Sequence, residues 1–267
     1  MQLVDIGANL THDSFAPDLA SVVEQAQQAG VAHIMLTGTD LASSKAALKL
    51  AARQPEYFRT TVGFHPHIAG DVSAADLSEA ARLTSEEHVV AVGETGLDYN
   101  RNFSPKSDQI RVFERHLELA VELGKPVFLH QRDAHEDFLP ILKTHRSALN
   151  GGVVHCFTDT RAALDDYLAL DMHIGITGWI CDERRGLELQ ETVRAIPLDR
   201  LLIETDAPYL LPRTIRPRPK TRRNEPRYLP AVLEKIAECR QQSLTELAEA
   251  TTANACRLFN LPLNSSR

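Results

Sequence analysis

The sequence predicts an α/β fold, a (β/α)8 barrel of the TIM type. Eight short apolar runs alternate along the chain with longer amphipathic ones. Several runs, such as VVAVGE and KPVFLH, are nearly continuous in apolar residues, which is typical of parallel strands covered on both faces. The length of 267 residues suits eight strand–helix units in one barrel. An open doubly wound sheet is the alternative, but no GxGxxG or GxxxxGK[ST] turn supports it.

The strands are expected where the apolar runs lie between turn-forming residues. In chain order they are Gln2–Ile6, Val31–Leu36, Arg59–Val62, Val89–Gly93, Val127–His130, Gly152–His155, His173–Ile176 and Leu201–Ile203.

Helices are expected in most of the intervening stretches. Asp13 or Ser14 is a candidate cap for the first helix, Pro55 ends the second, and Gly124 with Pro126 ends the third. The predicted helices are Phe15–Ala29, Leu41–Gln54, Ser107–Leu123, Arg161–Leu170, Arg185–Ile196, Leu229–Arg240 and Leu244–Phe259.

The composition is that of an ordinary globular protein. Hydrophobic residues make up 43% and charged residues 24%, which excludes collagen-like, coiled-coil and disordered classes. Four scattered cysteines without a CxxC pair indicate a reducing compartment. No signal peptide or membrane-length apolar stretch is present, so a cytoplasmic protein without a membrane partner is expected. No repeat or linker divides the chain, so one domain over residues 1–267 is predicted.

One segment departs from the acidic character of the chain, whose net charge is −7. Residues Tyr209–Arg227, YLLPRTIRPRPKTRRNEPR, contain four prolines and seven basic residues. Prolines disfavour a helix or a central strand, so a long, stiff, positively charged loop is predicted. Such a loop is either a phosphate-binding surface or a solvated surface loop, and the sequence favours neither.

Polar side chains that suit divalent cations stand where several strands end. The carboxyl ends of all strands in a parallel barrel lie on one rim, so these side chains are expected to converge. One such histidine is usually a satisfied buried side chain, and one such aspartate is usually a cap; the joint pattern instead predicts a metal centre. The residues are Asn9, His65, Glu94, His130, His155 and Asp206.

Six motifs carry a resemblance to a known family. They are GFHPH from Gly63, VGETGLDYNRNFSP from Val92, PVFLHQRDAHEDF from Pro126, VVHCFT from Val153, IGITGWICDERRGLEL from Ile174 and LLIETDAPYLLPR from Leu201. The chain resembles the TatD family of metal-dependent deoxyribonucleases almost from end to end, and RRNEP from Arg222 fits as well. The family's fold is a metal-bearing barrel related to the amidohydrolases, and its bacterial branch implies a 3′–5′ exonuclease.

The resemblance implies roles for particular residues. Glu94 is expected to bridge two metal ions, with His130 and His155 completing the first site. Asp206 is expected to serve the second site and to orient or deprotonate the attacking water. His65 is expected to contact a substrate phosphate, so Glu94, Asp206 and His65 are the expected catalytic residues.

The first strand departs from the family pattern. Most members carry an HxH pair there, whereas this chain has Gly7 and Asn9, so the second metal site is expected to be weaker. Mg²⁺ is the expected ion in function because it prefers oxygen ligands, and Zn²⁺ or Mn²⁺ suits the site of His130 and His155.

The expected substrate is single-stranded DNA or RNA, with a role in DNA repair or turnover implied by the family. The predicted phosphate contacts, besides His65, are Arg132, Arg216, Arg218 and Arg222. A metal-dependent amidohydrolase or esterase for small substrates, an aminoacyl-tRNA deacylase and a non-catalytic binding protein stay open as alternatives. A monomer is expected.

Overall fold

A computed structural model describes residues 1–262 of the chain. Its eight strands belong to one sheet in the order β1-β2-β3-β4-β5-β6-β7-β8, each hydrogen-bonded to its neighbour in sequence. This strand order confirms the predicted (β/α)8 TIM-type barrel. The strands are β1 Leu3–Ala8, β2 Val31–Leu36, β3 Phe58–Val62, β4 Val89–Asp98, β5 Val127–Arg132, β6 Gly152–Val154, β7 His173–Ile176 and β8 Leu201–Ile203.

Nine α-helices lie within residues 1–262. They are α1 Leu19–Gln28, α2 Leu41–Arg53, α3 Ala74–Thr84, α4 Lys106–Leu123, α5 His135–His145, α6 Arg161–Ala169, α7 Leu187–Thr192, α8 Leu229–Arg240 and α9 Leu244–Phe259. In this part of the chain no helix is both long and apolar enough to cross a membrane.

Two of these helices, α3 and α5, are missing from the sequence prediction. Ser73 caps α3 through a reciprocal capping box with Asp76, and the helix buries Ala80 and Leu83 in a core with Phe64. In α5 the inner Pro140 hides the helical pattern, because proline usually ends a helix.

The start of the first helix is also corrected. Neither Asp13 nor Ser14 caps an α-helix; both belong to a 3-10 turn, Asp13–Phe15, which His12 caps. The helix α1 itself begins only at Leu19. Likewise α7 is shorter than the predicted Arg185–Ile196, because a 3-10 turn follows it at Val193–Ala195.

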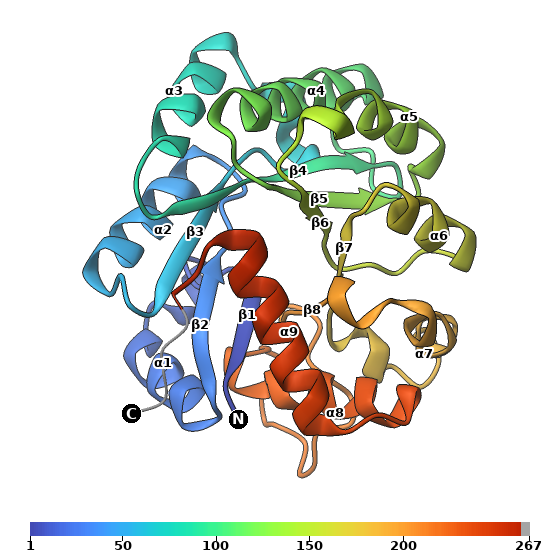
Figure 1. Ribbon diagram of the computed structural model, residues 1–267. Helices are drawn as coiled ribbons and strands as arrows, with labels where there is room; N and C mark the ends of the chain where they lie inside the picture. The colour runs from blue at the N-terminus through green and yellow to red at the C-terminus, as the bar shows by residue number, and fades with distance from the viewer. Residues whose placement is uncertain (263–267) are drawn as a thin grey trace. The chain divides into compact units, whose positions relative to one another are not determined.

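The described residues group into two compact units. Unit 1 comprises residues 1–35, 156–164 and 174–262, and unit 2 comprises 36–155 and 165–173. In unit 2 the strands β3 to β6 pair in parallel, and α2, α3 and α4 pack against β3 and β4 (Figure 1). In unit 1, β7 and β8 pair in parallel, and α8 and α9 pack against β1 and β8. The single domain over residues 1–267 stays a prediction.

Candidate active site

The predicted metal ligands of unit 2 converge on one carboxylate. Glu94, in β4, is buried, and its Oε1 is contacted by three imidazoles. His155 Nε2 lies 2.9 Å from this oxygen, His130 Nδ1 lies 3.0 Å away and His65 Nε2 lies 3.3 Å away. The ligand atoms of His65, Glu94 and His130 all lie within 4.8 Å of one another, so this group could hold a metal ion.

Local structure explains how these side chains reach one place. His130 lies in β5, beside β4, with Gly96 of β4 in register with it. His155 directly follows β6, which pairs with β5, and its ring stacks on Phe128 with centroids 4.5 Å apart. His65 follows β3 and begins a 3-10 turn, Pro66–Asp71. Neighbouring parallel strands therefore bring their polar ends together, as predicted.

The ring nitrogens of His65 have distinct roles. The backbone N–H of His67 donates to His65 Nδ1 at 3.1 Å, so the neutral ring carries its proton on Nε2, facing Glu94. Burial lowers the pKa of His65 to about 3, so the ring is neutral at pH 7. From the sequence alone, a protonated, charged His65 could bind a substrate phosphate. The structure instead favours a neutral imidazole, which would bind the phosphate through an uncharged N–H donor.

His130 lies between two carboxylates. Its Nδ1 faces Glu94, and its Nε2 lies 3.2 Å from Asp98 Oδ2. Burial lowers the pKa of His130, but the contacts with Asp98 and Glu94 outweigh burial and raise it above its usual value. A histidine that ligates a metal through one nitrogen usually donates its other N–H to a carboxylate, and Asp98 is placed for that contact.

Glu94 is held ionised by its neighbours. Burial raises the pKa of this carboxyl, but the imidazoles of His155, His65 and His130 hold it well below its usual value. A tetrahedral ion with bonds of about 2.0–2.1 Å separates its ligand atoms by roughly 3.4 Å. The distances from Glu94 Oε1 to the ring nitrogens of His65, His130 and His155 are 3.3, 3.0 and 2.9 Å, close to that separation. The three residues whose ligand atoms all lie within 4.8 Å of one another, and so fit a divalent cation, are His65, Glu94 and His130.

Asp98 is a part of this cluster that the sequence prediction missed, and His67, which the sequence left as a possible member, contacts it. Asp98 Oδ2 accepts from His67 Nε2 at 2.8 Å as well as from His130. The prediction ended β4 at Gly93, because four of the next five residues, ETGLD, are polar or small. The strand in fact continues to Asp98, and the two-residue period of a strand puts Glu94 and Asp98 on the same face. The four-residue spacing of Glu94 and Asp98 in an extended strand was the signal by which the sequence could have predicted Asp98 as part of the cluster.

Asp206 lies in unit 1, just after β8. Its backbone N–H donates to Gly7 O at 2.8 Å, and its Oδ1 accepts from Asn9 Nδ2 at 3.1 Å. The residue stands at a positive φ of 54°, in a turn rather than at a helix cap. The structure thus brings together Asp206, Gly7 and Asn9, the three residues expected to shape the second metal site.

The basic side chains of the loop after β8 fall into two groups, those with an acidic partner among the described residues and those without one there. Arg213 pairs with Glu183, Arg223 with Asp18 and Glu225, and Arg227 with Glu225. The guanidinium of Arg216 donates to the backbone carbonyls of Arg213 and Ile215. Within residues 1–262, Arg218, Lys220 and Arg222 form no ion pair or hydrogen bond with another side chain. Arg132, the last residue of β5, is half-buried.

The eight-stranded fold and the histidine–carboxylate cluster define the class of barrel hydrolases with a candidate metal centre. The profile of the family described as TatD related DNase matches residues 4–260, so the chain belongs to the TatD-related DNase family.

Individual relatives agree with this family. The chain is 51% identical over 259 residues to the 3′–5′ ssDNA/RNA exonuclease TatD of Erwinia tasmaniensis, covering 97% of this chain and 100% of that protein. The crystal structure of a TatD family hydrolase from Entamoeba histolytica is 27% identical, with a TM-score of 0.89 over 98% of this chain and 99% of that one. The TatD homologue YjjV of Escherichia coli is 28% identical, with a TM-score of 0.87 over 97% and 98%.

Proposed function

We propose that this protein is a metal-dependent nuclease that hydrolyses phosphodiester bonds, acting as a 3′–5′ exonuclease on single-stranded DNA or RNA. The observation that carries the proposal is the convergence of His130 and His155 on one oxygen of the ionised, buried Glu94. Membership of the TatD-related DNase family supports the reaction class, and the name of the Erwinia tasmaniensis relative supports the substrate and the polarity.

Each residue has a defined part in the proposed reaction. Glu94, His130 and His155 hold the cation, and Asp98 keeps His130 in the tautomer that turns Nδ1 toward Glu94. A divalent cation supplies Lewis acidity, which stabilises negative charge on the phosphoryl oxygens and makes water more acidic. The Nε2–H of His65 and the guanidinium of Arg132 donate to phosphate oxygens. Arg216, Arg218 and Arg222 are proposed as further phosphate contacts.

The bond changes of the step balance as a hydrolysis. A water oxygen bonds to phosphorus at the 3′ end while the ester bond to the preceding nucleotide breaks, and Asp206 accepts the proton of the water. The oxygen that leaves takes up a proton and becomes the new terminal hydroxyl of the shortened strand.

We further propose two metal sites of unequal affinity. Asp206 and Asn9 offer oxygen ligands, which Mg²⁺ prefers, whereas the two imidazoles favour Zn²⁺ or Mn²⁺. Calorimetric titration of metal-free protein checks this: one tight Zn²⁺ site is expected, and the second fills only at roughly millimolar Mg²⁺. In a folded Gly7→His/Asn9→His variant the second site tightens for Zn²⁺. Two equally tight sites in the unchanged protein would contradict the assignment.

The decisive experiment follows 5′-labelled single-stranded DNA and RNA, with and without Mg²⁺ and with a chelator. A ladder that shortens one nucleotide at a time from the 3′ end, and stops with chelator, is expected. Stable strands under every metal condition would contradict a nuclease. A parallel panel of small amides, esters and aminoacyl-tRNA tests the amidohydrolase and deacylase alternatives, for which this chain is expected to show no turnover.

We propose that the protein acts in the cytoplasm and takes part in the repair or turnover of DNA. We also propose that it is a monomer. Sedimentation at several protein concentrations tests the monomer, and a mass that rises with concentration would contradict it.

A further inference from the structure

Asp206, the proposed proton acceptor, occupies an uncommon backbone conformation. Its φ of 54° lies in the left-handed region, which residues other than glycine seldom adopt unless the surrounding structure holds them there. Residues held in this way are concentrated at functional sites. The bonds that hold the chain around Asp206 therefore bear on the direction of its carboxylate.

One side of this turn is held by β1 and the residue that follows it. The carboxylate of Asp5 accepts from the backbone N–H of Thr205 at 2.9 Å and from the Thr205 hydroxyl at 2.6 Å. The backbone N–H of Asp206 donates to Gly7 O at 2.8 Å, and Asn9 Nδ2 donates to Asp206 Oδ1 at 3.1 Å. Both the backbone and the side chain of Asp206 are thus attached to this part of unit 1.

The other side of the turn is held by Asn224, a fully buried residue with no part in the proposed reaction. Its Nδ2 donates to Thr205 O at 2.9 Å, and its backbone N–H donates to Pro208 O at 2.9 Å. Its Oδ1 accepts from the backbone N–H of Glu225 at 2.9 Å. The amide can face only one way, because a carbonyl oxygen accepts and a backbone N–H donates. Asn224 therefore spans the turn from the residue before Asp206 to the second residue after it.

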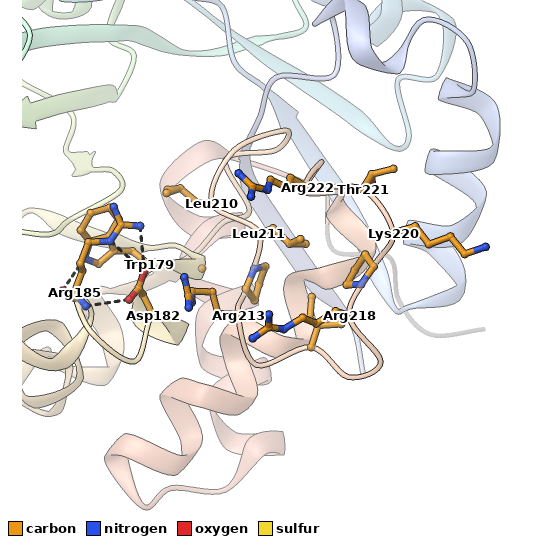
Figure 2. A pocket seen from close by; sticks show the side chains of 14 residues that line it. Trp179, Asp182, Arg185, Leu210, Leu211, Arg213, Arg218, Lys220, Thr221 and Arg222 are labelled. Atoms are coloured by element: carbon orange, nitrogen blue, oxygen red, sulfur yellow. Dashed lines mark hydrogen bonds and ion pairs between the residues drawn. The ribbon is translucent and has the colours of Figure 1, made fainter.

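The position of Asn224 is itself fixed by the segment around it. Residues between 210 and 222 line one wall of a cavity of about 620 Å³ (Figure 2), and the bond from Asn224 to Pro208 closes this basic loop at its base. Arg223 donates to both carboxylate oxygens of Asp18, at 2.8 and 2.7 Å, and to Glu225 at 2.9 Å. The backbone of Asn224 is therefore held independently of its side chain.

We infer that Asn224 is a positioning residue for Asp206. Its side-chain amide fixes Thr205 and so directs the Asp206 carboxylate, whereas its backbone N–H closes the basic loop. The inference deepens the proposed function and rests on it for the role of Asp206. Loss of the amide is therefore expected to weaken the Asp206 site for Mg²⁺ and to slow hydrolysis, while binding of the strand stays unchanged.

Asn254 offers a matched control on the same strand. It is also buried, and its Nδ2 donates to Leu198 O at 2.8 Å and to Leu201 O at 2.9 Å, at the opposite end of β8 from Asp206. Asn224→Ala and Asn254→Ala are both expected to lower Tm, since each removes a donor from a buried carbonyl.

Metal binding then separates the two variants without any measurement of activity. In calorimetric titration of metal-free protein, Asn224→Ala is expected to bind Mg²⁺ at least about tenfold more weakly, whereas Asn254→Ala binds it as the unchanged protein does. Zn²⁺ binding at the Glu94 cluster is expected to be unchanged in both variants.

Kinetics on a labelled strand distinguish positioning from a structural role. At saturating Mg²⁺, Asn224→Ala is expected to lower kcat about 10- to 100-fold and to change KM by less than about twofold, whereas Asn254→Ala changes neither. In an Asp206→Asn background, Asn224→Ala is expected to lower kcat no further, because Asn224 acts through Asp206. Should Asn224→Ala fail to fold by circular dichroism, Asn224→Asp gives the same comparison, because it keeps the size and the Oδ1 acceptor but loses the donor.

Mg²⁺ binding and kcat equal to those of the control would overturn the inference and leave Asn224 a structural residue. A raised KM with an unchanged kcat would also overturn it, because the side chain would then serve the basic loop. An equal further loss of kcat in the Asp206→Asn background would show that Asn224 acts elsewhere. If the unchanged protein cleaved no strand, the proposed function would fail, while calorimetry of the two asparagine variants would still decide the inference.

Discussion

At the scale of single residues, Glu94 is the centre of the candidate site. Three imidazoles face one of its oxygens, and together they keep a fully buried carboxyl ionised. An ionised carboxylate in such a place carries a large desolvation cost unless cations or donors surround it. A bound divalent cation would offset that cost and use the same atoms.

Replacing Glu94 therefore tests the metal centre most directly. Glu94→Gln keeps the shape but removes the charge, so nuclease activity is expected to fall at least about 100-fold, and Glu94→Ala is expected to abolish it. Metal affinity is measured by calorimetry and activity with a labelled strand. The exposed Glu87, replaced by Gln, is the matched control and is expected to behave as the unchanged protein. Near-normal turnover of Glu94→Ala at saturating Mg²⁺ would show that the centre lies elsewhere.

We propose Asp98 as a positioning residue, because its carboxylate contacts His130, His67 and the backbone N–H of Arg101. Asp98→Asn is expected to weaken metal binding about 10- to 100-fold. Because the ligands themselves are intact, excess metal is expected to restore most of the activity. Asp133→Asn makes the same chemical change at a carboxylate that bonds the Asn100 amide, and is expected to leave metal affinity unchanged. Activity that metal cannot restore would point to a purely structural Asp98.

At the scale of elements, the register of β4 against β5 places His130 beside Glu94. Gly96 lies in register with His130, has a φ of 146°, and packs its Cα against the neighbouring backbone. A Cβ on Gly96 would lie 1.9 Å from His130 O, so only glycine lets the two strands approach this closely.

Gly96→Ala is expected to move β5 and with it His130. The variant is expected to lose at least about 2 kcal/mol of stability, which lowers Tm by about 4–8 °C, and to bind metal more weakly. Thermal unfolding and calorimetry measure the two effects. Gly70→Ala is the control, because a Cβ there meets its nearest atoms at an ordinary 3.4 Å. A Gly96→Ala protein as stable as the control would contradict this account of the strand register.

Strands and helices could be predicted from the sequence where neighbouring residues carry a clear pattern. Uninterrupted apolar runs located all eight strands within a few residues, since burial on both faces leaves an unmistakable pattern. The end of β4 was predicted too early, because its last residues are mostly polar or small and resemble the end of a strand. The helix α5 was missed, because Pro140 inside it resembles a helix break. In both cases tertiary packing overrides local propensity.

At the scale of the whole molecule, stability is expected to depend on pH through Asp5. This carboxyl in β1 is fully buried and accepts from the backbone N–H of Thr205 and Gly7 and from the Thr205 hydroxyl. Burial outweighs these bonds and raises the pKa of Asp5 from 3.8 to about 7. The folded state thus holds a proton that the unfolded state releases near pH 4, so this group makes stability fall as pH rises from about 4 to 7.

Asp5→Asn checks the sign of this effect. The amide resembles the protonated carboxyl, so the variant is expected to match the unchanged protein near pH 4–5 and to exceed it by a few kcal/mol above pH 7. Urea unfolding of metal-free protein at a series of pH values measures the difference. If the free energies of unfolding of the variant and the unchanged protein changed in parallel with pH, Asp5 would keep one protonation state over the whole range, and the predicted pH dependence would be wrong.

The sequence by itself determined the barrel and the family, because burial of strands on both faces leaves a pattern in residue type and order. It also placed the polar residues Glu94, His130 and His155 at the ends of neighbouring strands, and their role as metal ligands stays a prediction. Only the tertiary structure decided that one oxygen of Glu94 is shared by three imidazoles, that Asp98 supports His130, and which basic residues of the loop lack acidic partners. Those facts depend on distances between residues far apart in the chain, and such distances are set by strand register and loop packing, which local pattern does not encode.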